Sequence, residues 1–426
     1  MTVIPAHWYN IRADIPLDVP DDRPSPFASG TLRPQLPAKL IRQEMSRARE
    51  VPIPAEVLER YAAWRPTPLH RARALERDLD TAARIYFKYE GGNISGSHKL
   101  NTAIAQAHYY AAAGATRLAT GTGAGQWGTA MVAAGAMFGL ETVVYMTGHS
   151  YRTKPYRRTL MEMLGGRVVP VEGNLAAALA AALHACEDPG TRFCTGSGES
   201  YSLLHQTVIG QEAVAQLELL GEWPDVVVAS LGAGSNFGGT AFPFVGAARR
   251  GEAPAVRAVA VEPSACPKLT RGQYRYDFTD SSRETPMQKM YTLGHAFATP
   301  EIHAGGLRYH GTSKLVSALY ADGAIEGAAY GQPEVFAAAV RFAQLEGIVP
   351  APESAHAVHG AVVEALRSRA EKQPRVILFC LSGHGQLDLA AYAEYAGGRL
   401  VDVVPDDAEI ERSLAQIPQD TAAARR

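Results

Sequence analysis

A lysine at a predicted helix start is the first residue of this sequence whose position suggests covalent chemistry. Lys99 lies in the motif GSHKLN, which follows a glycine-rich stretch and opens an alanine-rich helical pattern over residues 98–113. The positive end of a helix dipole disfavours a charged amine there, and the neutral amine is the form that attacks an aldehyde. An isolated lysine is usually a solvated surface residue, so the case for Lys99 depends on its neighbours.

The motif TGAGQWG (122–128) follows a short predicted strand and contains a match to G-x-G-x-x-G, the dinucleotide-binding pattern. That pattern also requires an acidic residue at the end of the next strand to bind a ribose. Here that strand ends at Met146, Thr147 and Gly148, so a nicotinamide cofactor is disfavoured. The backbone N–H groups of such a loop can instead bind a carboxylate.

A second glycine loop, GAGSN (232–236), follows the buried-type strand pattern DVVVAS and precedes a helix. Glycines let the backbone close around an anion, and the loop lacks the Lys-Ser/Thr pair of an ATP-binding loop. We therefore predict a phosphate site that does not hold ATP, with a structural turn as the alternative. Ser382 ends another buried strand pattern, RVILFCL, at the end of a parallel strand where open α/β sheets bind ligands.

Glu353, His356 and His359 form a competing constellation. Their spacing places them on one helix face, where they resemble half of a di-metal site. A complete site needs a second motif of this kind, and the sequence has none. We therefore predict packing histidines and no metal.

The composition is typical of a soluble globular protein with two α/β domains. Hydrophobic residues make up 46% of the 426 residues, charged residues make up 20%, and the formal net charge is −2. So small a charge disfavours binding to nucleic acid or to anionic membranes. The sequence has no signal-peptide pattern, no apolar run of membrane-spanning length and no C-x-x-C pair among its four cysteines, so we expect a reduced cytoplasmic protein.

Strand and helix patterns alternate along most of the chain, which predicts parallel sheets covered by helices. The predicted strands are 84–90, 117–120, 142–146, 167–171, 225–230, 256–262 and 375–381. The predicted helices are 98–113, 155–164, 175–185 and a short one near 54–64. We expect an extended arm over 1–60, a smaller domain over 95–195 and a larger domain made of 61–94 and 196–426, with a loosely ordered tail after about 405.

Taken together, these motifs resemble the β chain of tryptophan synthase, specifically its second, longer-armed type. The likeness extends from about residue 65 to residue 395. It is carried by RPTPLHRARALE, GSHKLNTAIAQA, TGAGQWGTA, KPYRR, LLHQTVIG, GAGSNF, VEPSACP, MYTLGH, HAGGLRYHG, GIVPAPESAHA and LSGHG. The resemblance implies a diverged member with the type II fold of enzymes that use pyridoxal 5′-phosphate (PLP), an α/β fold whose two domains hold the cofactor between them.

The resemblance also implies roles for individual residues. Lys99 is expected to hold PLP as a Schiff base and to move the α-proton, Ser382 to hydrogen-bond the pyridine nitrogen, and Glu353 to lie near the pyridine ring. The other implied cofactor contacts are His98, Asn101, Gly232, Ala233, Gly234, Ser235, Asn236 and Gly383. The implied substrate-binding residues are Thr122, Gly123, Ala124, Gly125, Gln126 and Trp127. Similarity to the family further implies a monovalent cation and a homodimer, while association with an α chain stays open.

Three departures from the family pattern stand out. The family has a glutamate that assists loss of the β-hydroxyl and attack by indole, and this chain has Gly121 at that position. We expect the glycine to open space for a different nucleophile. The segment between VVPVEGN and SLLHQT looks shorter than in second-type enzymes. Finally, Ala233 replaces a usual glycine.

We therefore expect β-replacement on L-serine or an activated serine, through an aminoacrylate, with an acceptor that is not the usual one. The alternatives are tryptophan synthesis from indole and serine, or simple elimination of the dehydratase type. A non-enzymatic relative is disfavoured because Lys99, the phosphate loop and Ser382 are all present. The expected partners are an amino acid and a small nucleophile.

Overall fold

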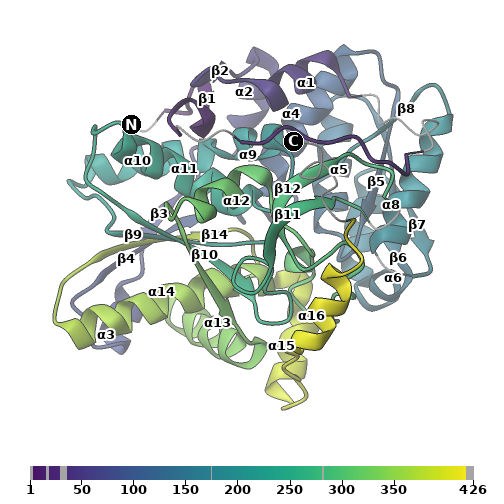
Figure 1. Cartoon of the computed structure of the whole chain (residues 1–426). Helices are drawn as coiled ribbons and strands as arrows, with labels where there is room; N and C mark the ends of the chain where they lie inside the picture. The colour runs from purple at the N-terminus through teal and green to yellow at the C-terminus, as the bar shows by residue number, and fades with distance from the viewer. Residues whose placement is uncertain (1–2, 16–18, 29–35, 174, 281–282, 419–426) are drawn as a thin grey trace, which may run out of the picture.

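The computed structural model describes residues 3–15, 19–28, 36–173, 175–280 and 283–418. It contains two main sheets, one mostly and one wholly parallel, and helices cover each of them (Figure 1). The larger sheet has six strands, in the order β13 (Glu326–Tyr330), β10 (Arg257–Pro263), β9 (Val226–Ser230), β14 (Val376–Leu381), β4 (Arg84–Tyr89) and β3 (Leu69–Arg71). All of its pairings are parallel except that of β3 with β4. The smaller sheet is wholly parallel, in the order β7 (Arg167–Val171), β6 (Glu141–Thr147), β5 (Arg117–Thr122) and β8 (Thr191–Phe193).

The helices follow the strands in the alternation that the sequence predicts. Those before the end of the smaller sheet are α1 (Ala38–Met45), α2 (Ala55–Tyr61), α3 (Arg73–Asp78), α4 (Lys99–Ala112), α5 (Gln126–Met137), α6 (Gly148–Thr153), α7 (Pro155–Met163) and α8 (Leu175–His184). The later ones are α9 (Ser200–Gln206), α10 (Val208–Leu219), α11 (Ser235–Arg249), α12 (Lys314–Ala321), α13 (Gln332–Glu346), α14 (Pro352–Glu371), α15 (Leu389–Ala396) and α16 (Asp407–Leu414). Every predicted strand and helix is present, within a few residues of its predicted bounds.

The central strands of the larger sheet are apolar on both faces because helices cover both. Phe87 and Phe379 point to the side of α13 and α14, while Leu378 and Cys380 join the core on the other side with α4, α9, α10 and α11. In the smaller sheet, α5 and α7 cover one face, and α8 packs on the other through Ala182 and Leu183. This two-sided burial is the reason that these strands read as continuous hydrophobic runs.

Antiparallel pairs lie outside the two main sheets. In the arm, β1 (His7–Tyr9) pairs with β2 (Glu50–Pro52), and α1 lies between them in sequence. The arm is therefore more structured than the expected extended segment. Farther along the chain, β11 (Gln273–Phe278) pairs with β12 (Met287–Thr292). In the described part of the chain, no helix is long and apolar enough to cross a membrane.

The expectation of a loosely ordered tail after residue 405 is wrong for the stretch that forms α16. The Asp406 side chain accepts a hydrogen bond from the backbone N–H of Glu409 and so caps the helix. Ile410 and Leu414 are buried against Cys266 and Leu293. Ile417, just after the helix, belongs to the same apolar cluster. The tail beyond residue 418 lies outside the described residues.

Four fully buried charged side chains lie beneath the start of α4. Arg65 pairs with Glu90 at 2.9 Å and with Glu212 at 2.8 Å, and Lys88 pairs with Glu212 at 2.8 Å. Asn101 accepts from Arg65 and donates to Glu90. The network therefore fixes the first turn of α4, which carries Lys99, to the edge of the larger sheet.

Candidate active site

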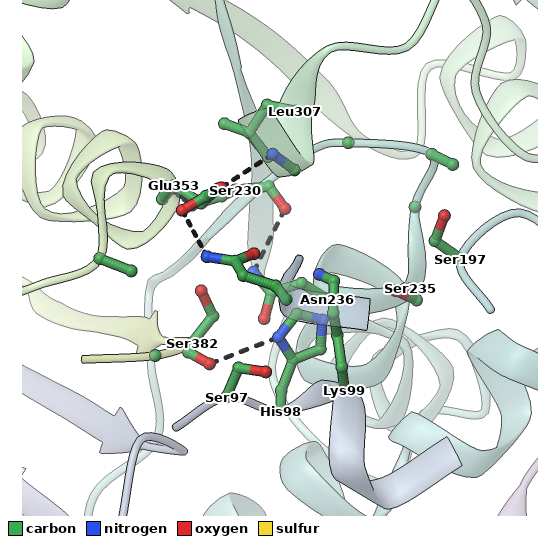
Figure 2. Close-up of a pocket in the computed structure, with 17 residues that line it drawn as sticks. Ser97, His98, Lys99, Ser197, Ser230, Ser235, Asn236, Leu307, Glu353 and Ser382 are labelled. Carbon is green, nitrogen blue, oxygen red and sulfur yellow. Dashed lines mark hydrogen bonds between the residues drawn. The ribbon is translucent and has the colours of Figure 1, made fainter. Parts of the chain in front are cut away.

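A cavity lies at the carboxyl ends of β9 and β14, where α4 and α11 begin (Figure 2). This is the place at which open parallel sheets bind ligands. Its lining comprises Ser97, His98, Lys99, Gln126, Ser197, Ser230, Gly232, Ala233, Gly234, Ser235, Asn236, Gly306, Leu307, Ala351, Glu353, Ser382 and Gly383. The structure thus brings together residues that are far apart in the sequence.

Lys99 is the first residue of α4 and lies deep in the protein, at the wall of this cavity. Burial lowers the pKa of its amine, and the charge of Arg157 lowers the pKa further, while Glu353 acts in the opposite direction. The lowered pKa favours the neutral amine, which is the nucleophilic form. The sequence-based expectation for the electrostatics of Lys99 agrees with this direction.

His98 lies beside Lys99 and has one unpaired ring nitrogen. Its Nδ1 faces the carbonyl oxygen of Ser382 at 3.4 Å, whereas Nε2 has no hydrogen-bond partner among the described residues. Burial and the positive charge of Lys99 lower the pKa of His98 to about 3. A buried polar atom without a partner is uncommon in a folded protein, so Nε2 is available to a bound group.

The loop Gly232–Asn236 requires its glycines. A Cβ on Gly232 would lie 2.6 Å from the carbonyl oxygen of Gly306, and Gly234 has a φ of +135°, which strains any other residue. The loop ends at the start of α11, where free backbone N–H groups favour an anion. Asn236 Oδ1 also has no partner among the described residues. This cradle, with the unpaired atom of His98 and the amine of Lys99, fits an aldehyde cofactor that carries a phosphate, such as PLP.

Ser382 and Glu353 form the opposite wall. The hydroxyl groups of Ser382 and Ser354 are 2.7 Å apart, and the backbone N–H of Gly383 donates to Ser354 at 2.9 Å. Glu353 accepts from the Gln126 side chain and from the backbone N–H of Gly306, both at 2.8 Å (Figure 2). Both carboxylate oxygens of Glu353 are therefore engaged in joining the first glycine loop to the Gly306 segment.

Several predicted site residues do not line the cavity. Asn101 is the main correction, because its side chain is taken up by Arg65, Glu90 and Gln206. Of the predicted substrate residues, only Gln126 lines the cavity. Trp127 donates its ring N–H to Thr120 at 2.8 Å. The residues that line the cavity without having been predicted are Ser97, Ser197, Ser230, Gly306, Leu307 and Ala351. A sequence pattern could have predicted Ser197 as a site residue. It lies in the run TGSGES, a third glycine-serine loop directly after a strand.

A buried charge cluster joins the first glycine loop to the segment after β14. Arg157, in α7, lies against Gly125, where a Cβ would be 3.2 Å from its side chain. Its guanidinium donates to Asp388, and Lys154 pairs with the same carboxylate at 3.0 Å. Burial opposes the charge of Asp388, but Arg157 and Lys154 outweigh burial and lower its pKa.

The space expected beside Gly121 is not open. The structure places the backbone of α8 against this residue, so a Cβ on Gly121 would lie 2.8 Å from both the N and the Cα of Leu179. Gly121 is on the face of β5 that α8 covers, like Ala119 two residues earlier. The glycine is therefore explained by close packing of a helix on a strand, and not by room for a larger nucleophile.

We expect Gly121→Ala to lower the free energy of unfolding by about 1–3 kcal/mol, because overpacking displaces α8. Urea unfolding of the two proteins measures this difference. Gly123→Ala is the matched control, since its Cβ would meet nothing within 4 Å. Gly121→Glu needs still more space and is expected not to improve condensation of indole with serine. Equal stability of Gly121→Ala and wild type would contradict this account of the packing.

Glu353, His356 and His359, which resemble half of a di-metal site in the sequence, each have a different partner in the structure. His356 Nδ1 faces the carbonyl oxygen of Pro352 at 2.9 Å, and His359 is 3.7 Å from Glu334. Glu353 is engaged with Gln126 and Gly306. In the described ranges, no group of three or more His, Cys, Asp or Glu side chains is placed to hold a metal ion.

Comparison with known proteins agrees with this geometry. The family described as "Pyridoxal-phosphate dependent enzyme" matches residues 61–383, which is most of the chain and includes Lys99, the phosphate cradle and Ser382. The chain belongs to this family, in its tryptophan synthase β branch. Members of the family use PLP as their cofactor, so this protein is a PLP-dependent enzyme.

Curated relatives in the family are similar over nearly their whole length. "Tryptophan synthase beta chain 2" of Thermotoga maritima is 50% identical over 412 residues, which cover 91% of this chain and 97% of the relative. The protein of the same name from Aeropyrum pernix is 47% identical and covers 96% of this chain and 97% of the relative.

Two solved structures are similar to this chain in fold. A fungal L-serine ammonia-lyase from Rhizomucor miehei superimposes with a TM-score of 0.61 at 16% identity and covers 78% of this chain and 98% of its own. The processed form of threonine deaminase isoform 2 from Solanum lycopersicum gives 0.62 at 17% identity and covers 90% of this chain and 97% of its own. The type II fold expected from the sequence is confirmed.

If Ser382 holds the pyridine nitrogen, its replacement should change the electronics of the bound cofactor. We expect Ser382→Asp to favour a protonated ring, and therefore to shift the visible absorption spectrum and the ratio of products. Ser382→Ala is the control that removes the hydroxyl without adding a carboxylate. An unchanged spectrum and product ratio in Ser382→Asp would count against this role.

Proposed function

We propose that this enzyme catalyses β-replacement on L-serine or an O-activated serine. The observation that carries the proposal is Lys99, an amine whose pKa is lowered by burial, at the wall of a cavity that also contains an anion cradle. The cavity is lined by most of the residues that the family resemblance assigns to the cofactor. The coarser statement, that the chain performs PLP-dependent chemistry, follows from its family.

The bound cofactor supplies an electron sink that acidifies the Cα–H bond and lets a substituent leave Cβ. In the proposed reaction, the amine of Lys99 takes the proton from Cα and later returns it. Backbone N–H groups of the loop 122–126 bind and orient the substrate carboxylate. Ser382 holds the pyridine nitrogen with a hydroxyl and so leaves the ring uncharged. Glu353 keeps Gln126 in place.

The proposal also concerns the acceptor, which is the nucleophile that adds to Cβ. Gly121 removes the carboxylate that the family uses on indole, and α8 fills the space beside it. We therefore propose an acceptor other than indole. The competing candidate is tryptophan formation, which the names of the relatives at 47–50% identity favour.

The test is to incubate the PLP-loaded enzyme with L-serine or an O-activated serine and a panel of a thiol, an amine and indole, followed by mass spectrometry of the products. A new amino acid that contains the thiol or the amine supports the proposal. Efficient formation of tryptophan favours the competing candidate. Release of pyruvate and ammonia without any adduct identifies elimination and contradicts β-replacement.

We also propose that the enzyme is a cytoplasmic homodimer, as the family resemblance implies. A formal net charge of −2 puts little repulsion between two copies. Multi-angle light scattering at micromolar concentration measures the mass in solution. A mass near 45.6 kDa alone, that of one chain, would contradict the dimer.

A further inference from the structure

Ser354 is a fully buried serine in the first turn of α14, behind the wall of the cavity. Its Oγ is 2.7 Å from the Oγ of Ser382 and accepts from the backbone N–H of Gly383 at 2.9 Å. Ser382 and Gly383 are among the described residues that line the cavity, and Ser354 is not. The hydroxyl of Ser354 can therefore act on a bound group only through Ser382.

A short ladder of backbone hydrogen bonds fixes the positions of the two serines. The segment after β14 lies between the segment before α4 and the segment before α14, with one antiparallel bridge on each side. On one side, the backbone N–H of His98 donates to the carbonyl oxygen of Ser382 at 2.8 Å. On the other side, the backbone N–H of Ala351 donates to the carbonyl oxygen of Gly383 at 2.9 Å. The ladder thus holds the first turn of α14, and Ser354 with it, against the end of β14.

Two arrangements of the hydroxyl protons are compatible with these contacts, and they present different groups to the cavity. If Ser354 donates to Ser382, the hydroxyl of Ser382 can donate its own proton into the cavity. If Ser382 donates to Ser354, Ser354 must donate to the carbonyl oxygen of Gly383, and Ser382 presents only a lone pair. The first arrangement suits an unprotonated ring nitrogen, which accepts a hydrogen bond, and the second suits a protonated one, which donates.

The distances favour the first arrangement. The second depends on a contact of 3.2 Å between Ser354 Oγ and the carbonyl oxygen of Gly383, which is long for an O–H···O bond. That carbonyl oxygen already accepts from Ala351, so it does not need the proton of Ser354. In the first arrangement, a chain of donors runs from the backbone N–H of Gly383 through Ser354 to Ser382, and each bond polarises the next.

The charges near this wall favour the same arrangement. The N-terminal end of α14 carries partial positive charge, which disfavours a second positive charge on a ring bound nearby. Glu353 is the only carboxylate among the described residues that line the cavity. Its two oxygens already accept from Gln126 and Gly306. The described part of the wall therefore offers a protonated ring nitrogen no carboxylate that is free of other partners.

We propose that Ser354 is a positioning residue for the cofactor: it directs the hydroxyl proton of Ser382 to the ring nitrogen and so keeps that nitrogen unprotonated. The proposal rests on the proposed function, in which Ser382 holds this nitrogen. Hydrogen bonds to the ring nitrogen are one means by which a protein tunes the electronics of such a cofactor. Ser354 thus sets the strength of the electron sink without touching the cofactor.

The test is NMR of the enzyme loaded with PLP that is isotopically labelled at the ring nitrogen, without substrate. For wild type we expect the chemical shift of an unprotonated nitrogen that accepts a hydrogen bond. In Ser354→Ala the donor behind Ser382 is lost, so the shift should move toward that of Ser382→Ala. Ser354→Cys keeps a weaker donor and should give an intermediate shift. The dissociation constant of PLP should rise about 2–10-fold in Ser354→Ala, as expected for the loss of one hydrogen bond.

Ser368→Ala is the matched control. Ser368 is another buried serine of α14, and its hydroxyl donates to the carbonyl oxygen of Gln373. Its replacement should change neither the chemical shift nor the affinity for PLP. A double variant supplies a second criterion. In the Ser382→Ala background, Ser354→Ala should have no further effect on either quantity, because its effect passes through Ser382.

Three results would overturn the proposal: a protonated ring nitrogen in wild type, a wild-type shift in both Ser354→Ala and Ser354→Cys, or independent effects of the two alanine substitutions in the double variant. An unchanged shift in Ser382→Ala overturns it as well, because Ser382 would then not hold the nitrogen. Failure of the proposed β-replacement is distinct. It appears as the absence of any adduct in the product assay of wild type, whereas the chemical shift is measured without substrate.

Discussion

Lys99→Ala is expected to lose turnover by at least the 10²–10⁴-fold that a positioned acid–base group typically supplies, and to lose the covalent link to the cofactor. The physical reason is that the deep Lys99 amine, with its lowered pKa, lies at the wall of the cavity that also holds the anion cradle. The cofactor phosphate should still bind, because the cradle Gly232–Asn236 and His98 are untouched. The measurements are single-turnover kinetics and borohydride reduction followed by mass spectrometry of the labelled peptide.

Lys39→Ala serves as the control for this substitution, since Lys39 is exposed on α1. It should keep both the reducible link and normal turnover. If Lys99→Ala retains a borohydride-reducible link together with wild-type turnover, another lysine holds the cofactor. Lys268 would then be the next to test, because its amine is fully buried and donates to the carbonyl oxygen of Leu231, the residue before the cradle.

Glu212→Ala is expected to lower the free energy of unfolding by about 3–5 kcal/mol. Glu212 accepts from both Arg65 and Lys88 in a site without solvent access. Its removal leaves two buried cations with one carboxylate between them. Chemical denaturation measures the loss. Glu218→Ala on the exposed side of the same helix is the matched control and should change stability by less than about 0.5 kcal/mol.

The same network predicts how stability depends on pH. Burial opposes ionisation of Glu90, but the charge and hydrogen bonds of Arg65 outweigh burial and lower its pKa from 4.5 to about 2. A lowered pKa in the folded state stabilises the protein above the unfolded value. The contribution of Glu90 is therefore complete above about pH 4.5 and is lost as the pH falls toward 2. An acid-unfolding midpoint unchanged in Glu90→Gln would contradict this assignment.

The sequence predicts those parts of the fold and of the candidate site that depend on local patterns. It does not predict the parts that depend on packing between distant segments. Continuous apolar runs such as those of β4 and β14 predict buried parallel strands, because residues on both faces meet helices. The motifs around Lys99, the cradle and Ser382 predict the cavity wall, because each follows a strand or begins a helix. These are properties of short segments, and the structure contains them all.

The remaining features depend on contacts between distant segments. Asn101 lies two residues from Lys99, but Arg65 and Glu90 turn its side chain away from the cavity. No local pattern predicts that α8 packs against Gly121, because α8 begins more than 50 residues later in the sequence.

The charge cluster of Arg157, Lys154 and Asp388 connects the region proposed to bind the amino acid with the region proposed to bind the cofactor. Arg157 touches the loop proposed to hold the substrate carboxylate, and Asp388 follows the strand end proposed to hold the cofactor nitrogen. If the cluster transmits free energy between the two regions, occupancy of one alters the affinity of the other. Thermodynamic linkage then requires the two effects to be equal: the amino acid would raise the affinity for the cofactor by the same factor by which the cofactor raises the affinity for the amino acid.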